Sequence, residues 1–179
     1  MRAHHHQVGL HAVCLREDLP GGGSLANERG GLHPFFHPKV SMMTRQIVGV
    51  EALARIATPQ MGFASPAAYV ELAERNQRID ALTYAMARAV AKHAVAFDGL
   101  PCSINISPMS LERVEFADQM AAAINEAGLD CKQFTLEVTE SRAIEFGVNA
   151  FETMTHLRGK GFGLAIDDFG AGTSNIDRL

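Results

Sequence analysis

The sequence predicts an α/β fold in which strands alternate with helices around a parallel sheet or barrel. Two strand-like runs are each followed by a Ser-Pro pair, Ser65-Pro66 and Ser107-Pro108. Serine is a favoured helix cap and proline is tolerated in the first helical turn, so both pairs indicate helix starts. Strands that alternate with helices in this way favour βα units. A chain of 179 residues suits one domain with a sizeable core.

The fold is expected to begin with a β-hairpin. Residues 34–44 and 46–54 are rich in strand-forming residues and are expected to pair through Thr44-Arg45. Pro38 lies inside the first of these runs and cannot donate a backbone hydrogen bond, which places that strand at an edge or rim. Met42 and Met43 are expected to pack in the core or against the strands.

Helices and strands are then expected to alternate up to a pair of aspartates. Apolar side chains at helical spacing predict a helix from Ser65 and a second one over about residues 80–96. Gly128 is expected to end a later helix, because glycine readily adopts the left-handed conformation of a helix terminus. The remaining predicted elements are strands at 101–106, 134–138 and 163–166, and helices after Ser107, at 116–127 and at 150–158.

Residues 1–33 differ from the rest of the chain. They contain the tract His4 to His6 and two glycine-rich breaks, without a convincing apolar period. This part is predicted to be a poorly ordered leader or linker, or the remnant of an upstream domain. Residues 34–179 are predicted to form the globular part. The histidine tract is interpreted as solvated, with weak metal binding as the alternative.

Composition excludes several classes of partner and location. The net charge is −4, with 47% hydrophobic and 20% charged residues, which gives no basis for binding a nucleic acid polymer or a membrane surface. No apolar run approaches the roughly 20 residues that span a bilayer. No signal-peptide pattern is present, so a cytoplasmic location is expected. Cys14, Cys102 and Cys131 are odd in number and form no CxxC pair, which favours reduced thiols.

Acidic and amide side chains stand near the ends of four predicted strands. Parallel barrel strands all end on one face, so these side chains are expected to meet there. Carboxylate and amide oxygens are the ligands that Mg²⁺ and Mn²⁺ prefer, and two such ions can activate a water and stabilise a phosphoryl displacement. The candidate metal ligands are Glu51, Asn105, Glu137, Asp167 and Asp168. Taken singly, Glu51 can also be a solvated carboxylate, Asn105 a turn cap and Asp167-Asp168 an Asx-type turn.

Six ordered motifs resemble those of the EAL domain family, cyclic di-GMP-specific phosphodiesterases with a modified TIM barrel. The first is Glu51-Ala52-Leu53 itself, extended by Arg55. The others are Gly62-Phe63-Ala64-Ser65-Pro66, Glu71-Leu72-Ala73-Glu74, Asn105-Ile106-Ser107-Pro108, Glu137-Val138-Thr139-Glu140 and the run from Asp167 to Ser174. Residues 36–40 also resemble the opening strand of members often attached to response-regulator domains. The resemblance implies a TIM-like (β/α) barrel of the EAL type, incomplete here, with about five of the eight strands.

The resemblance also implies a role for each candidate ligand. Glu51, Asn105, Glu137 and Asp167 would bind a first Mg²⁺ or Mn²⁺ ion, and Asp168 a second. Hydrolysis of cyclic di-GMP to linear pGpG is the implied reaction. The candidate catalytic residues are Glu51, Asp167, Asp168 and Glu140.

The resemblance also implies roles for three substrate-binding residues and for Glu140. Arg55 would meet a substrate phosphate, where a guanidinium fork fits better than an ammonium. Leu53 would lie under the guanine–sugar unit, and His37 stands where the family usually has a substrate-binding glutamine. Glu140 would hold the loop 169–174, which in this family shapes the metal site and a homodimer contact. The structural alternatives are a surface arginine, a rim histidine without function and a glutamate that serves a helix dipole.

The match ends where complete members continue with further strands, including one that carries a Lys-x-Asp motif. An unclosed barrel exposes backbone donors and apolar side chains. The phosphodiesterase activity of the isolated chain is therefore expected to be impaired or lost. Two alternatives stay open: a non-catalytic regulator that binds cyclic di-GMP or a protein partner, and a fragment without function.

Overall fold

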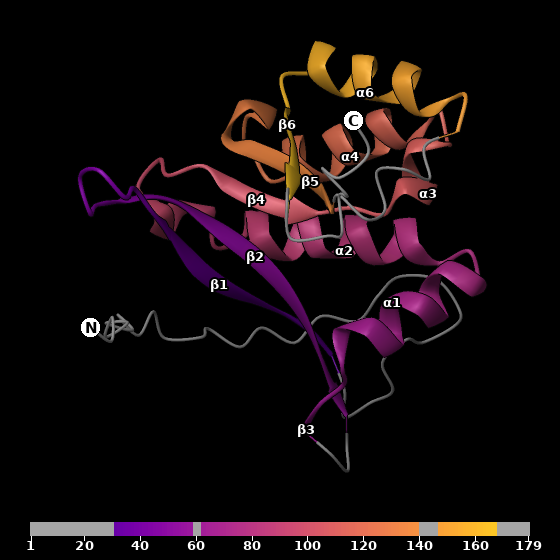
Figure 1. The fold of residues 1–179 in the computed structure, drawn as a ribbon, viewed down its shortest axis with the longest axis horizontal. Coiled ribbons are helices and arrows are strands. Elements are labelled where there is room, and N and C mark those ends of the chain that lie inside the picture. The colour runs from indigo at the N-terminus through magenta and orange to yellow at the C-terminus, as the bar shows by residue number, and fades with distance from the viewer. Residues whose placement is uncertain (1–30, 59–61, 140–146, 168–179) are drawn as a thin grey trace, which may run out of the picture.

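The computed structural model describes residues 31–58, 62–139 and 147–167, and these residues form an open α/β sheet covered by helices (Figure 1). The first strand, β1 (Leu32–Val40), pairs antiparallel with β2 (Ile47–Thr58), and the next three strands of the sheet follow in parallel. A short strand, β3 (Gly62–Phe63), pairs with the end of β2. The sheet order is β1 (Leu32–Val40), β2 (Ile47–Thr58), β4 (Cys102–Asn105), β5 (Phe134–Thr139) and β6 (Gly163–Asp167).

Within the described ranges, β1 and β6 end this sheet and do not pair with each other. The predicted fold class is therefore confirmed as an α/β sheet of the barrel type that the described strands leave incomplete. The five strands form part of a barrel wall, which the described residues leave open between β1 and β6.

The expected β-hairpin is present, with one difference at its tip. The strands end at Val40 and restart at Ile47, and Arg45 adopts a φ of 59° in the turn between them. Pro38 lies on β1, an edge strand as predicted. The prediction that Met42 and Met43 pack in the core or on the strands is wrong, because both are 96% exposed. They belong to the turn that projects beyond the sheet.

The helices begin where the Ser-Pro pairs predicted. Ser65 and Ser107 occupy the positions before α1 (Pro66–Arg75) and α3 (Pro108–Leu111), and the Ser107 hydroxyl accepts a hydrogen bond from the Met109 amide at 3.2 Å. The helices and short 3₁₀ turns are α1 (Pro66–Arg75), α2 (Ile79–Ala91), η1 (Ala94–Phe97), α3 (Pro108–Leu111), α4 (Phe116–Asn125), η2 (Cys131–Gln133) and α6 (Ala150–Gly159).

The second helix is shorter than predicted. α2 ends at Ala91, and the amides of His93 and Ala96 then bond to carbonyls three residues earlier. This tighter bonding produces the 3₁₀ turn η1, which stops at Asp98 with a left-handed φ of 50°. Apolar spacing continues through both segments, so the pattern did not reveal the break.

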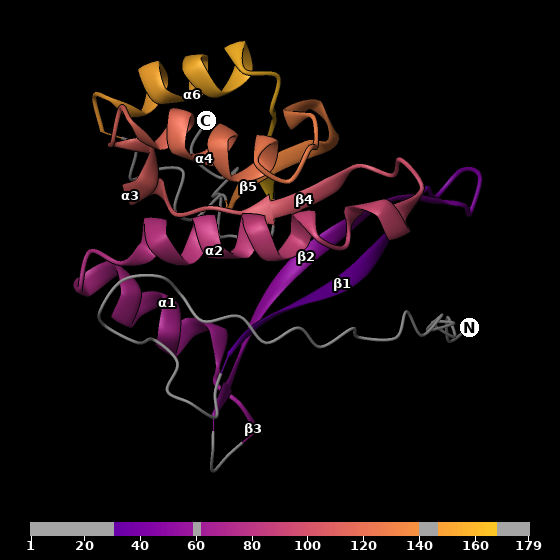
Figure 2. The same ribbon diagram turned by 180° about the vertical axis from the view of Figure 1, so that it is seen from behind.

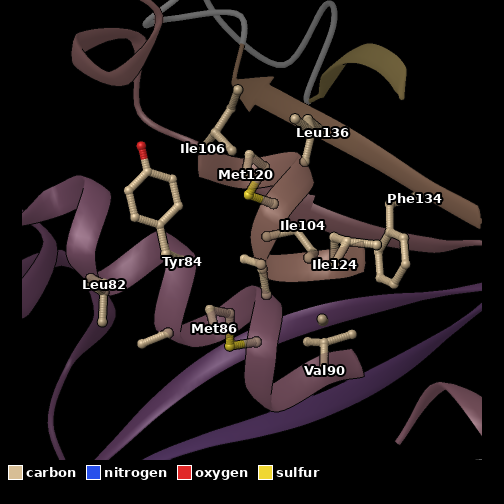
Figure 3. Packing of buried hydrophobic residues seen from close by; sticks show 14 of the residues in the cluster. Leu82, Tyr84, Met86, Val90, Ile104, Ile106, Met120, Ile124, Phe134 and Leu136 are labelled. Atoms are coloured by element: carbon tan, nitrogen blue, oxygen red, sulfur yellow. The ribbon is translucent and has the colours of Figure 1, made fainter. Parts of the chain in front are cut away.

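The core lies between the parallel strands and the helices (Figures 1 and 2). Ile104 of β4 and Leu136 of β5 are 1% and 0% exposed. Figure 3 shows Met86 of α2 and Met120 and Ile124 of α4 among them. Successive side chains of a strand point to opposite faces, so the even-numbered residues of β4 and β5 point into the core. The odd-numbered residues point to the opposite face.

Two further expectations concern the whole chain. Among the described residues, no helix combines the length and the apolarity needed to cross a membrane. Cys102 and Cys131 are buried free thiols, as predicted, and Cys14 lies outside the described residues. The division of the chain at residues 33 and 34 stays a prediction.

Candidate metal centre

Three carboxylates from three different strands converge on the odd-numbered face. Glu51 of β2, Glu137 of β5 and Asp167 of β6 each offer one oxygen, and these oxygens lie within 4.8 Å of one another. A group of this size and composition can hold a metal ion, because hard divalent cations prefer several carboxylate oxygens at short range.

The strand register explains why residues so far apart meet. Glu51 is paired with Ser103, and Ser103 with Thr135, so Glu137 lies one inward-facing position further along β5. Asp167 is paired with Thr139, one inward-facing position further again. From Glu51 to Glu137, and from Glu137 to Asp167, the position along the sheet advances by two residues. Such a stagger is expected of tilted strands in a barrel wall. The carboxylates therefore form one cluster although they occupy three levels of the sheet.

Asn105 at the end of β4 joins this cluster. Its side-chain nitrogen donates a hydrogen bond to Oε1 of Glu51 at 2.9 Å. Asn105 is exposed and Glu51 is half-buried, so this side of the cluster is open to solvent. The structure thus brings together the four residues proposed from the sequence as ligands of a first ion.

Glu137 is the buried member of the group. The residue is 5% exposed, and its Oε1 accepts a hydrogen bond from the ammonium of Lys39, which also bonds to the Ser103 hydroxyl at 2.8 Å. The second carboxylate oxygen, Oε2, is buried and has no hydrogen-bond partner within the described part of the chain. A buried carboxylate oxygen without a partner is costly unless something charged or polar meets it. The donor set and this oxygen together fit a hard divalent cation.

Lys39 and Ser103 were missed in the sequence. Lys39 belongs to β1, where it is paired with Gly49, and His37 two residues earlier is paired with Glu51. Paired residues of antiparallel strands share a face. The available signal was therefore the spacing of two residues between His37 and Lys39, which puts the lysine on the face of the acidic cluster.

The three candidate substrate residues lie beside the cluster on β1 and β2. His37 is exposed, while Leu53 and Arg55 are half-buried. The guanidinium of Arg55 lies 5.8 Å from the ring centre of Phe35 and donates to the carbonyl oxygen of Ala54 at 2.8 Å. These contacts hold Arg55 near the rim.

A cavity of about 400 Å³ lies beside the candidate substrate residues, and of the four proposed ligands of the first ion only Asn105 lines it. Leu53, Arg55 and Asn105 contribute to its wall, which α1 and α2 complete. Tyr69 of α1 donates its hydroxyl to the Ala54 carbonyl oxygen at 2.7 Å and so fixes α1 against β2. Burial raises the pKa of Tyr69, and the nearby Arg55 partly opposes that rise.

Two candidate catalytic residues cannot be placed. Asp168, Glu140 and the loop 169–174 lie outside the described residues. Their roles stay predictions, as do the roles of the residues that the structure does place.

Comparison with known proteins supports the resemblance seen in the motifs. The family profile described as EAL domain matches residues 23–179. Cyclic di-GMP phosphodiesterase PA2567 of Pseudomonas aeruginosa is 34% identical over 153 residues, which cover 81% of this chain and 25% of that protein. Cyclic di-GMP phosphodiesterase RocR of the same organism is 30% identical over 156 residues, covering 85% and 40%. The chain thus spans between a quarter and two fifths of the length of these curated relatives.

Solved structures share the fold. The PaMucR phosphodiesterase in complex with c-di-GMP superposes with a TM-score of 0.71 at 28% identity, over 80% of this chain and 60% of that one. Klebsiella pneumoniae BlrP1, in a complex with manganese and cy-diGMP, gives a TM-score of 0.60 at 28% identity, over 83% and 41%. The profile match over most of the sequence, on a fold of this kind, establishes that the chain belongs to the EAL domain family.

Proposed function

We propose that this chain belongs to a metal-dependent phosphodiesterase that hydrolyses one phosphodiester bond of cyclic di-GMP and releases linear pGpG. The observation that carries the proposal is the cluster of Glu51, Glu137 and Asp167, with its buried, unpartnered carboxylate oxygen. Relatives that share this family are named cyclic di-GMP phosphodiesterases, and solved neighbours contain the dinucleotide.

Four residues are proposed to hold the first cation, and one the second. Glu51, Asn105, Glu137 and Asp167 supply the oxygen ligands of the first, and Asp168 joins the second ion. Bound there, the ions supply Lewis acidity and an activated water. Mg²⁺ and Mn²⁺ both suit this donor set.

The chain's own side chains are proposed to orient the dinucleotide. The planar guanidinium of Arg55 presents paired donors to a phosphate, and its contact with the Phe35 ring limits its freedom. Leu53 offers an apolar surface in the same cavity wall for the guanine–sugar unit. His37, exposed and in register with Glu51, can donate a hydrogen bond to the substrate at the rim.

The setting of this activity is proposed from the sequence alone. A cytoplasmic bacterial protein with an upstream regulatory domain and a homodimer contact through the loop 169–174 is the expected context. The proposed substrate, cyclic di-GMP, is a second messenger, so the proposed context is second-messenger signalling.

A hydrolysis assay tests the proposal. The full chain is incubated with cyclic di-GMP and Mg²⁺ or Mn²⁺, and pGpG is separated by chromatography. Glu51→Gln removes a charged ligand and is expected to reduce the pGpG formation that the native chain retains by at least about 100-fold. Glu152→Gln, an exposed glutamate on α6, is the matched control and is expected to leave the rate unchanged.

The alternative functions give different results in the same assay. Retention of cyclic di-GMP in equilibrium dialysis without pGpG formation indicates a binding regulator. The absence of both binding and product overturns the proposed function.

A further inference from the structure

Lys39 reaches from the edge strand β1 into the acidic cluster. Its ammonium donates to Oε1 of Glu137 on β5 and to the hydroxyl of Ser103 on β4 at 2.8 Å. Its side chain is 39% exposed, whereas that of Glu137 is 6% exposed. A flexible lysine that is partly solvated therefore meets a carboxylate that is almost completely buried.

The register of the hairpin makes room for this reach. Lys39 is paired with Gly49, which has no side chain, so nothing on the neighbouring position of β2 stands between the lysine and β4. A β-carbon at Gly49 would lie 2.9 Å from the carbonyl oxygen of Pro101, the residue before β4, so the two backbones approach closely there. The ammonium thus reaches Glu137 on β5 across β2 and β4.

The contact between Lys39 and Glu137 changes the electrostatic repulsion within the acidic cluster. Carboxylates within 4.8 Å of one another repel when no cation lies between them. The ammonium of Lys39 reduces that repulsion in the cation-free protein. A divalent ion on the same carboxylates meets the ammonium as a like charge, and the two cations compete for one set of oxygens.

We propose that Lys39 is a built-in counter-cation of the metal centre, which stabilises the cation-free site and weakens its affinity for divalent metal ions. This inference rests on the proposed metal-dependent function. Lys39 acts through Glu137, and its role is to set how easily the ion exchanges. Removal of its charge raises the free energy of the cation-free state and lowers that of the loaded state, so both effects tighten metal binding.

Calorimetric titration of the full chain with Mn²⁺ tests the proposal. Lys39→Met removes the charge at similar length, and Lys39→Gln removes the charge but keeps a donor for the buried carboxylate. Both variants are expected to bind Mn²⁺ at least about tenfold more tightly than the native chain. Lys39→Arg keeps the charge and is expected to stay near the native affinity.

A matched control removes a lysine from an ion pair elsewhere. Lys160 bonds to Asp118 at 2.5 Å on the helical side of the molecule, so Lys160→Met deletes a similar contact away from the cluster. This variant is expected to bind Mn²⁺ as the native chain does. Thermal unfolding gives a second readout: Lys39→Gln is expected to melt lower than the native chain without metal and to recover that loss when Mn²⁺ is added.

The outcomes separate this inference from the proposed function. Mn²⁺ binding that is equal or weaker in both uncharged Lys39 variants overturns the counter-cation role and leaves the metal centre standing. A melting loss in Lys39→Gln that is the same with and without Mn²⁺ also overturns it, because that result describes a purely structural lysine. No Mn²⁺ binding by any variant, Lys39→Gln included, overturns the metal centre and the inference together.

Discussion

Burial controls the protonation of Tyr84, one of the two tyrosines. Tyr84 is 9% exposed and stacks on Phe116 with ring centres 5.5 Å apart. Its pKa is raised above the ordinary value of 10.0, first by burial and then by the charge of Asp80, while Arg113 opposes the rise. The folded state therefore holds this proton at a pH where the unfolded chain has already lost it.

The consequence is a loss of stability in alkaline solution. A group whose pKa is raised by folding stabilises the protein below its unfolded pKa, and this contribution is lost as pH increases beyond it. The free energy of unfolding is expected to fall above pH ~10, by up to about 1.4 kcal/mol per pH unit for each such group. Denaturant titrations at several pH values measure this slope.

A single substitution isolates the contribution of Tyr84. Tyr84→Phe keeps the ring and is expected to show a shallower fall, because one ionising group is gone. The fall does not disappear in that variant, since burial also raises the pKa of Tyr69 and raises that of Cys102 to about 12. An unchanged slope in Tyr84→Phe contradicts the assignment.

At the residue scale, the acidic part of the candidate centre was predictable and its cation was not. Parallel strands end on one face, so the convergence of Glu137 and Asp167 near the ends of β5 and β6 follows from the pattern. Glu51 was also expected near a strand end, but it lies within β2 (Ile47–Thr58) and reaches the cluster through the strand register. Lys39 comes from an antiparallel strand in the middle of a run. The spacing from His37 indicates its face, but its contact with Glu137 spans 98 positions, and no local pattern in the sequence specifies that partner.

At the scale of elements, β2 lies close to the backbone of Pro101, the residue before β4. The Val50 amide donates to the Pro101 carbonyl oxygen at 2.9 Å, next to Gly49. A methyl group at Gly49 would press on that same carbonyl, which is backbone and cannot rotate away. Gly49→Ala is expected to lower the free energy of unfolding by about 1–3 kcal/mol in a denaturant titration.

A second glycine provides the control for this prediction. Gly159 ends α6, and an added β-carbon there meets no atom within 4 Å among the described residues. Gly159→Ala is expected to leave stability unchanged or to raise it by about 0.5–1 kcal/mol. Equal stability in the two variants contradicts the strand contact as the cause.

Element boundaries were predicted where chemistry marks them. Ser65 and Ser107 precede helices, and Gly128 follows one with a φ of 76°. The break after Ala91 and the strand β3 were missed, because neither carries a proline or a change of apolar period. The burial of Met42 and Met43 was predicted wrongly because methionine is usually buried. The sequence alone does not show that the turn between β1 and β2 projects beyond the sheet.

At the scale of the whole molecule, a metal ion would connect strands that otherwise meet only through their neighbours. β2 and β6 lie at separate places in the sheet, and β6 pairs with β5 alone within the described residues. Addition of Mn²⁺ is expected to slow amide hydrogen exchange in β6 more than in α4, because an edge strand opens most easily. Chelation is expected to reverse this protection.

The variant Glu137→Gln is the control for the exchange experiment. It keeps the size of the side chain and removes one charged ligand of the proposed centre. No Mn²⁺-dependent protection is expected in β6 of this variant. Equal protection in native and variant chains contradicts the link between the cluster and the edge strand.

The hairpin that carries Lys39 also has a consequence for the order of assembly. β1 and β2 are neighbours in the sequence, whereas β5 and β6 join the sheet only after crossover connections. Contacts between nearby segments form faster than distant ones, because less chain entropy is lost. The hairpin is therefore expected to place Lys39 and Glu51 on one face before Glu137 and Asp167 join them, so that each later strand adds its negative charge next to a cation already present.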